Sequence, residues 1–146
     1  MVNVFVTGGT GFIGSRVIKR LIDNGYRVTA LSRKTGTDLE KLGVNIVQGS
    51  LKDLDTIASA AATADAVMHL AFGHDFTKYM EALSEDTAVV KTITKALANS
   101  GKLFVITSGT AVAGDTGKDV KGEVAPTMSG RGISECAALE VSRLIA

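Results

Sequence analysis

The sequence has few of the residues that cross-link or kink a chain. It contains one cysteine, Cys136, one proline, Pro126, and no tryptophan among its 146 residues. A single cysteine excludes an internal disulfide and fits a reducing compartment. The formal net charge is only +1, which gives no indication of a nucleic-acid partner or a membrane surface. No apolar run approaches the roughly 18 residues that a membrane-spanning helix needs.

The N-terminal segment is apolar, but no basic residues precede it and glycines interrupt it from Gly8 onward. It is therefore typical of a strand rather than of a signal peptide, and we expect a cytoplasmic protein. The length and the 45% apolar content predict one domain over residues 1–146 with a real hydrophobic core.

Short β-branched runs alternate with segments of helical periodicity along the chain. Strands are predicted over residues 2–7, 27–31, 44–47, 66–70 and 103–107. Helices are predicted over 12–22, from about Asp53, over 77–99 and from about Ser134, with a loop over 114–122. Apolar strands that alternate with helices are typical of a parallel sheet covered on both faces. The expected fold is α/β, a doubly wound parallel sheet of about five strands flanked by helices.

Glycines recur at Gly8, Gly11 and Gly14, between the first expected strand and the first expected helix. In a dinucleotide-binding turn these positions allow the tight bend, the approach to a pyrophosphate and the close packing of helix on strand. The helix N-terminus adds free amide groups and a partial positive charge. A glycine-rich turn without a ligand is the alternative, but the flanking strands favour a Rossmann-type cofactor site. The expected contacts in the turn are Thr7, Gly8, Thr10, Gly11, Phe12, Ile13 and Gly14.

The end of the second expected strand indicates which dinucleotide is bound. An NAD site usually has an acidic residue about 20 residues after the turn, where it binds the ribose hydroxyls. Here the sequence reads Ser32-Arg33-Lys34, and the first carboxylate is Asp38. The two cations could bind a 2′-phosphate, with a hydrogen bond from Ser32, so the sequence favours NADP(H) over NAD(H). The alternative is that both are solvated loop cations.

The turn from Thr7 to Gly14 resembles the TGxxGFIG turn of extended and atypical short-chain dehydrogenases/reductases, the NAD-dependent epimerase/dehydratase-like branch. Residues 49–53, Gly-Ser-Leu-Lys-Asp, resemble the GDLxD segment of that branch, whose first Asp usually contacts the adenine and is Ser50 here. Residues 69–72, His-Leu-Ala-Phe, resemble its HLA segment, which lies along the cofactor. The resemblance adds these expected cofactor contacts: Ser50, Leu51, Leu70, Ala71 and Phe72.

The resemblance extends over nearly the whole chain, yet it corresponds to about the first half of a typical family member, without the C-terminal substrate-binding part. It implies catalysis by a tyrosine and a lysine four residues later, which lowers the tyrosine pKa from about 10. No Tyr-x-x-x-Lys occurs here, and Arg131 and Glu135 occupy the expected positions. A guanidinium stays protonated and cannot act as a general acid, and Glu135 has the wrong charge to lower a neighbour's pKa.

Two residues are candidates for catalysis. Ser108 follows the fifth expected strand, where open α/β sheets bind ligands, and the resemblance gives this serine a role in holding the substrate carbonyl. A hydroxyl that caps a loop is the alternative. His74 follows the fourth strand and could be oriented by Asp75, although an exposed loop pair has the same sequence. His69 is expected to be a core histidine. Neither histidine has other potential metal ligands near it in the sequence, so no metal site is predicted.

Two functions of different classes follow from these features. One is an NADP(H)-dependent oxidoreductase or epimerase-like enzyme that acts on a small carbonyl or alcohol. The other is a catalytically inactive nucleotide-binding module that senses the cofactor or pairs with another chain. A sheet that ends at the fifth strand has an unpaired edge, so we expect self-association, such as a homodimer through that edge or through helix 77–99.

Overall fold

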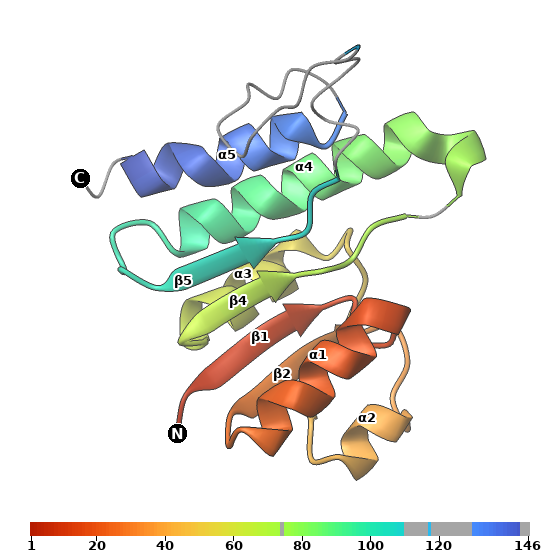
Figure 1. The fold of residues 1–146 in the computed structure, drawn as a ribbon, viewed down its shortest axis with the longest axis vertical. Helices are drawn as coiled ribbons and strands as arrows, with labels where there is room; N and C mark the ends of the chain where they lie inside the picture. Colours follow the sequence, from red (N-terminus) through yellow and green to blue (C-terminus); the bar gives the residue numbers. More distant parts are fainter. Residues whose placement is uncertain (74, 110–116, 118–129, 144–146) are drawn as a thin grey trace.

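The computed structural model describes residues 1–73, 75–109, 117 and 130–143. Five parallel strands form one sheet in the order β3-β2-β1-β4-β5 (Figure 1). They are β1 (Asn3–Thr7), β2 (Arg27–Ser32), β3 (Asn45–Gln48), β4 (Ala66–His69) and β5 (Leu103–Ile106). The strand order changes direction between β1 and β4, and ligands of open α/β sheets bind at such a switch point.

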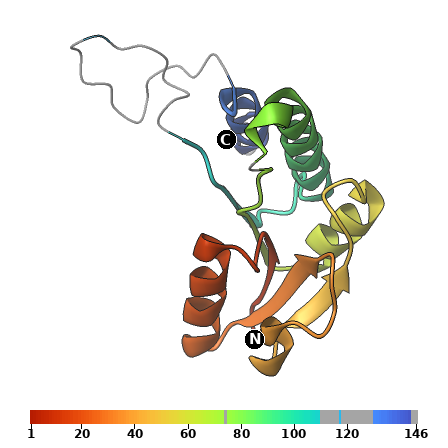
Figure 2. The ribbon, with the colours of Figure 1, turned by 90° about the vertical axis from the view of Figure 1, so that its right-hand side faces the viewer.

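Helices cover both faces of the sheet. They are α1 (Phe12–Asp23), α2 (Asp38–Lys41), α3 (Leu54–Thr63), the 3₁₀ turn η1 (Phe76–Lys78), α4 (Tyr79–Ala96) and α5 (Gly132–Arg143). Figure 2 shows α1 on one face, with α3 and α4 on the other, and α5 lies against the outer side of α4. The expected α/β fold with a doubly wound parallel sheet of five strands is thereby confirmed.

The alternation of side chains along β1 explains why the sheet has two cores. Phe5 points to one face and packs with Ile57 of α3 and Ile93 of α4. Val4 and Val6 point to the opposite face and belong to the cluster that includes Ile18 of α1. All of these side chains are almost completely buried. Burial on both faces is what makes the strands of a parallel sheet apolar throughout.

The structure departs from the sequence prediction in two short elements. Helix α2 was not expected, because a single helical turn is too short to show periodicity. It is held at its start by Glu40, whose side chain accepts a hydrogen bond from the amide of Thr37 at 2.7 Å. The helix expected over 77–99 is divided into η1, capped by Asp75, and α4, which ends at Ala96. The loop expected over 114–122 lies, except for residue 117, outside the described residues.

Candidate cofactor-binding site

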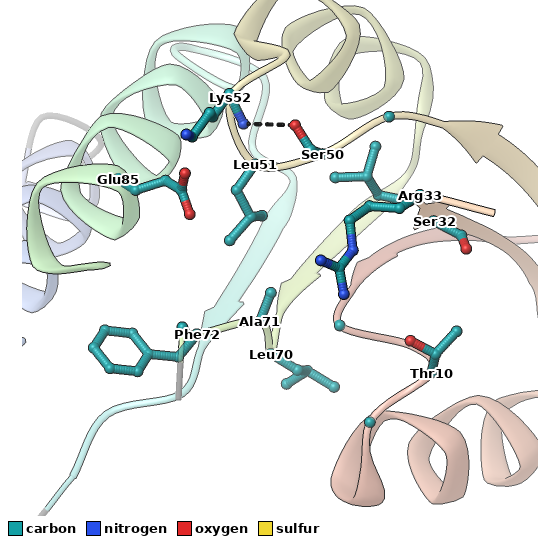
Figure 3. Close-up of a pocket in the computed structure, with 15 residues that line it drawn as sticks. Thr10, Ser32, Arg33, Ser50, Leu51, Lys52, Leu70, Ala71, Phe72 and Glu85 are labelled. Atoms are coloured by element: carbon teal, nitrogen blue, oxygen red, sulfur yellow. Dashed lines mark hydrogen bonds between the residues drawn. The ribbon is translucent and has the colours of Figure 1, made fainter. Parts of the chain in front are cut away.

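A cavity of about 670 Å³ opens at the carboxyl ends of the strands, beside the switch point between β1 and β4 (Figure 3). Its walls come from the glycine turn, the end of β2, the loop over 49–52, the segment over 70–73 and one residue of α4. The predicted cofactor contacts that line it are Gly8, Thr10, Gly11, Ser32, Arg33, Ser50, Leu51, Leu70, Ala71 and Phe72. Ten of the residues predicted from the sequence thus line the same cavity, although they come from segments that are distant along the chain.

Five other predicted contacts do not line this cavity: Thr7, Phe12, Ile13, Gly14 and Lys34. Thr7 is buried under the turn, and Gly14 is buried in the first turn of α1. The side chains of Phe12 and Ile13 are largely exposed, at 76% and 56%. Any contact from these two residues would therefore come from their backbone amides at the start of α1. No group of three or more metal-binding side chains occurs among the described residues.

The glycines of the turn are required by its geometry. Gly8 has a φ of +75°, and a Cβ on it would lie 2.7 Å from the amide nitrogen of Ala71. A Cβ on Gly14 would lie 2.1 Å from the carbonyl oxygen of Gly8, which is closer than atoms can approach. The turn closes with a 3.0 Å hydrogen bond from the Gly11 amide to the Gly8 carbonyl. The third glycine therefore permits helix and turn to pack together, as the sequence pattern predicts.

The start of α1 is suited to an anion. Gly11 is the N-cap residue, so no side chain of the cap satisfies the first amide groups, and the first turn contains no acidic residue. The positive end of the helix dipole is therefore not compensated by the chain itself. Because Gly11 also lines the cavity, the oxygens of a phosphate there would accept hydrogen bonds from these amide groups.

The end of β2 has one cation that faces the cavity. Figure 3 shows the guanidinium of Arg33 extending into the cavity above Thr10. The Ser32 hydroxyl donates a hydrogen bond to the Lys34 carbonyl at 2.7 Å and accepts one from the Lys34 amide at 3.2 Å. The Ser32 hydroxyl proton is thus already used in a hydrogen bond within the turn. The nearest following acid, Asp38, is exposed on α2 and pairs with Lys41 at 2.6 Å.

The loop after β3 is held by Asp53. One oxygen of its carboxylate, Oδ2, accepts hydrogen bonds from the amide and from the hydroxyl of Ser50, both at 2.7 Å. These two bonds hold the pKa of Asp53 below its ordinary value. The Ser50 hydroxyl also accepts a bond from the Lys52 amide at 3.2 Å. Ser50 therefore shapes the loop that presents Leu51 to the cavity.

A buried polar chain runs behind the cavity from the glycine turn to α5. The Thr7 hydroxyl lies 2.6 Å from Nδ1 of His69, and Nε2 of His69 lies 3.2 Å from Oδ1 of Asp86. The same oxygen of Asp86 accepts a hydrogen bond from Nη2 of Arg131 at 2.9 Å. The expectation of a core histidine is confirmed, because His69 is fully buried with both ring nitrogens engaged. The simplest proton arrangement has Thr7 donating to Nδ1 and Nε2 donating to Asp86.

Asp86 was missed by the sequence prediction. It lies on the same buried stripe of α4 as Val89, Val90 and Ile93, so an acid at an apolar helical position was the available signal. Burial would raise the pKa of Asp86, but hydrogen bonds with His69 and Ser134 and the charge of Arg131 outweigh it. The pKa of Asp86 is therefore held below its ordinary value.

The two atypical positions lie at the start of α5, and one of them contacts Ser108. The Ser108 hydroxyl donates a hydrogen bond to Oε2 of Glu135 at 2.8 Å. The guanidinium of Arg131 lies over the ring of Phe72, 4.5 Å from its centroid, and Phe72 lines the cavity. Arg131 thus lies against a residue of the cavity wall, and Glu135, four residues later, pairs with Ser108. His74, the other catalytic candidate, lies outside the described residues.

A switch-point cavity and a glycine turn at a helix N-terminus define a Rossmann-type nucleotide-binding domain. Residues 4–139 match the model of the NAD dependent epimerase/dehydratase family. The chain belongs to this family, and the resemblance inferred from its motifs is confirmed. No helix in the part of the chain that the structure describes has the length and apolar character needed to span a membrane.

Relatives of known sequence are longer than this chain. An uncharacterized protein of Schizosaccharomyces pombe is 38% identical over 117 residues, which are 79% of this chain and 40% of that protein. The sterol-4-alpha-carboxylate 3-dehydrogenase (decarboxylating) of Dictyostelium discoideum is 44% identical over 73 residues, or 49% of this chain and 22% of the enzyme. The matched segments thus cover less than half the length of these two relatives.

Solved structures show the same fold. The UDP-Glc/GlcNAc 4-epimerase of Campylobacter jejuni superposes with a TM-score of 0.78 at 19% identity, covering 98% of this chain and 48% of the epimerase. The enzyme WbmH of Bordetella bronchiseptica, solved in complex with NAD+, has a TM-score of 0.74 at 22% identity, covering 99% and 52%. At these identities the likeness is one of fold alone.

Proposed function

We propose that this chain is the cofactor-binding part of an NADP(H)-dependent oxidoreductase or epimerase-like protein that acts on a small carbonyl or alcohol in the cytoplasm. The observation that carries the proposal is the Arg33 guanidinium in the cavity, at the strand end where NAD sites usually have an acid. Membership of an NAD-dependent family and a cavity continuous with the glycine turn support the dinucleotide itself.

The phosphate preference follows from charge. A 2′-phosphate on the adenosine ribose is a dianion, and a guanidinium binds phosphate oxygens with two parallel hydrogen bonds. Arg33 is exposed and has no carboxylate beside it at the end of β2 in the described chain, so its charge is available to a ligand. Lys34 lies outside the cavity lining, and the Ser32 proton is already donated to Lys34. We therefore assign the preference for NADP(H) to Arg33 rather than to all three residues.

Ser108 and its neighbours have side chains that could hydrogen-bond to an oxygen of a substrate. A bound nicotinamide would supply the hydride chemistry of the family. Ser108 is the hydroxyl that could hold a carbonyl oxygen, but its proton is directed to Glu135. Ser108 must therefore turn from Glu135 to donate to a substrate. Arg131 could stabilise a negative oxygen, yet its proton stays on the guanidinium, so it cannot replace a tyrosine as general acid.

A second candidate function is a nucleotide-binding module without catalysis. The positions at which the family resemblance implies a tyrosine and a lysine hold Arg131, which is engaged with Asp86, and Glu135, which accepts from Ser108. Both are committed to contacts within the chain. Cofactor binding that is not followed by turnover would favour this function over the enzyme.

A titration with NADPH and NADH tests the proposal. We expect the wild-type chain to bind NADPH more tightly than NADH. Arg33→Asp should weaken NADPH binding by roughly tenfold or more and change NADH binding much less, because a charge-assisted contact is worth about 1.5–3 kcal/mol. Lys34→Asp is the matched control, since it makes the same charge change outside the cavity lining. Equal losses for NADPH and NADH in Arg33→Asp would refute the phosphate assignment.

A further inference from the structure

Glu85 is the only acidic residue in the described part of the chain that lines the cavity. It comes from α4 and is half-buried, and Figure 3 shows its carboxylate directed toward the space beside Leu51. Its chain neighbour Asp86 is engaged elsewhere, with His69 and Arg131 in the interior. The two adjacent acids on α4 thus face different environments. Asp86 belongs to the buried hydrogen-bonded series, whereas Glu85 faces the cavity and takes no part in that series.

The chemical character of the cavity wall changes from one side of the cavity to the other. The glycine turn and the start of α1 provide positive potential at one side, and Arg33 follows at the end of β2. Leu51 and Ala71 contribute apolar surface beyond Arg33, and Glu85 lies at the far side of Leu51 (Figure 3). A carboxylate would repel phosphate, so Glu85 suits the part of a dinucleotide that is flat, apolar and carries a neutral hydrogen-bond donor.

The adenine ring has this chemistry. Its faces fit apolar side chains such as Leu51, and its exocyclic amino group donates hydrogen bonds. Ser50 is the nearby hydroxyl on the loop after β3, but it already donates to Asp53 and accepts from the Lys52 amide. Glu85 has no hydrogen bond or ion pair with the described residues, so both of its oxygens are available as acceptors.

We propose that Glu85 accepts a hydrogen bond from the exocyclic amino group of adenine and thereby selects adenine over other purines, because it is the lone carboxylate in a cavity whose phosphate side is marked by Arg33 and the glycine turn. The inference rests on the proposed function, since it concerns the same cofactor. It adds a specificity-determining residue that the sequence motifs do not contain.

Lys52 provides the competing explanation. It also lines the cavity, and a carboxylate near a lysine can serve charge balance alone. No ion pair within 4.0 Å joins Lys52 to Glu85 in the described structure. If charge balance were the role of Glu85, its removal would affect all dinucleotides equally, whatever their base.

The test compares NADPH with its deamino analogue, in which hypoxanthine replaces adenine and a carbonyl oxygen replaces the amino group. We expect the wild-type chain to bind NADPH roughly tenfold or more tightly than the analogue, because the carboxylate loses a donor and faces an acceptor. Glu85→Ala should bring the ratio of the two dissociation constants close to one, mainly by weakening NADPH. Glu85→Gln, which is nearly isosteric and carries both a donor and an acceptor, should reduce the ratio while preserving the fold.

Glu81→Gln is the control, because Glu81 lies one helical turn earlier on α4, is exposed and does not line the cavity. Its ratio should equal that of the wild type. An unchanged ratio in both Glu85 variants would overturn the inference and leave the proposed function standing. Failure of the wild-type chain to bind NADPH, NADH or the analogue would overturn the proposed function and the inference together.

Discussion

His69 and Asp86 form a buried hydrogen-bonded pair, with Nε2 of the ring 3.2 Å from Oδ1 of the carboxylate and both side chains almost fully excluded from solvent. The pair joins β4 to α4, and Arg131 extends it to α5. Strand β4, helix α4 and the residue before α5 are therefore joined by a buried hydrogen bond and an ion pair as well as by apolar packing. Removing the shared carboxylate should affect more than one contact.

Asp86→Asn should lower the free energy of unfolding by about 3 kcal/mol, since it leaves a largely buried Arg131 without its ionic partner. Urea unfolding of the two proteins measures the difference. Arg131→Met in the Asp86→Asn background should recover part of the loss, because the unpaired cation is gone. A loss below about 0.5 kcal/mol for Asp86→Asn would show that the pair contributes little to stability.

The same carboxylate predicts a pH dependence. The pKa of Asp86 in the folded protein lies below its ordinary value of 3.8, so the unfolded chain takes up this proton first as the pH falls. The stabilisation from Asp86 is complete above the unfolded pKa and is lost as the pH decreases through the folded pKa. Melting temperatures measured between about pH 7 and pH 2.5 should therefore fall less steeply below pH 4 for Asp86→Asn than for the wild type.

The glycine turn gives a steric prediction. Gly14→Ala places a Cβ 2.1 Å from the Gly8 carbonyl oxygen, where backbone must move to relieve the contact. We expect a loss of about 3 kcal/mol in stability and weaker NADPH binding, since the displaced turn also lines the cavity. Gly109→Ala is the control, because nothing lies within 4 Å of a Cβ there. Wild-type stability and binding in Gly14→Ala would contradict this account of the turn.

Local sequence patterns predicted the parts of this structure that depend on neighbouring residues. Strand alternation and the glycines at Gly8, Gly11 and Gly14 placed β1, the turn and α1, because each rests on residues within one βα unit. The pairing of Ser108 with Glu135, 27 residues apart, was not foreseen. It depends on the path by which α5 returns to α4 and β5. Glu85 was missed for the same reason, since only tertiary packing decides which face of α4 borders the cavity.

The enzyme and the module differ in turnover. If the enzyme interpretation holds, absorbance at the nicotinamide band should change when the NADPH-loaded chain meets a panel of aldehydes and ketones. Ser108→Ala should abolish most of this change, because the hydroxyl that holds the substrate oxygen is lost. NADPH titration of the variant is the control and should match the wild type, because Ser108 does not line the cofactor cavity. Binding without any turnover in the wild type would favour the module.

The exposed edge of the sheet gives the last prediction. Strand β5 pairs on one side with β4 and has no strand on its other side among the described residues. Leu103 at its start is 65% exposed, and an unpaired edge with an apolar side chain favours association with another chain. We expect the chain to sediment as a dimer or larger species at high concentration, through this edge. Leu103→Lys should shift the protein toward the monomer, since edge lysines oppose strand pairing. Met80→Lys, which introduces the same charge at another exposed apolar side chain, on α4, should not. A wild-type protein that sediments as a monomer at high concentration would refute association at this edge, and a monomer produced only by Met80→Lys would place the contact on α4.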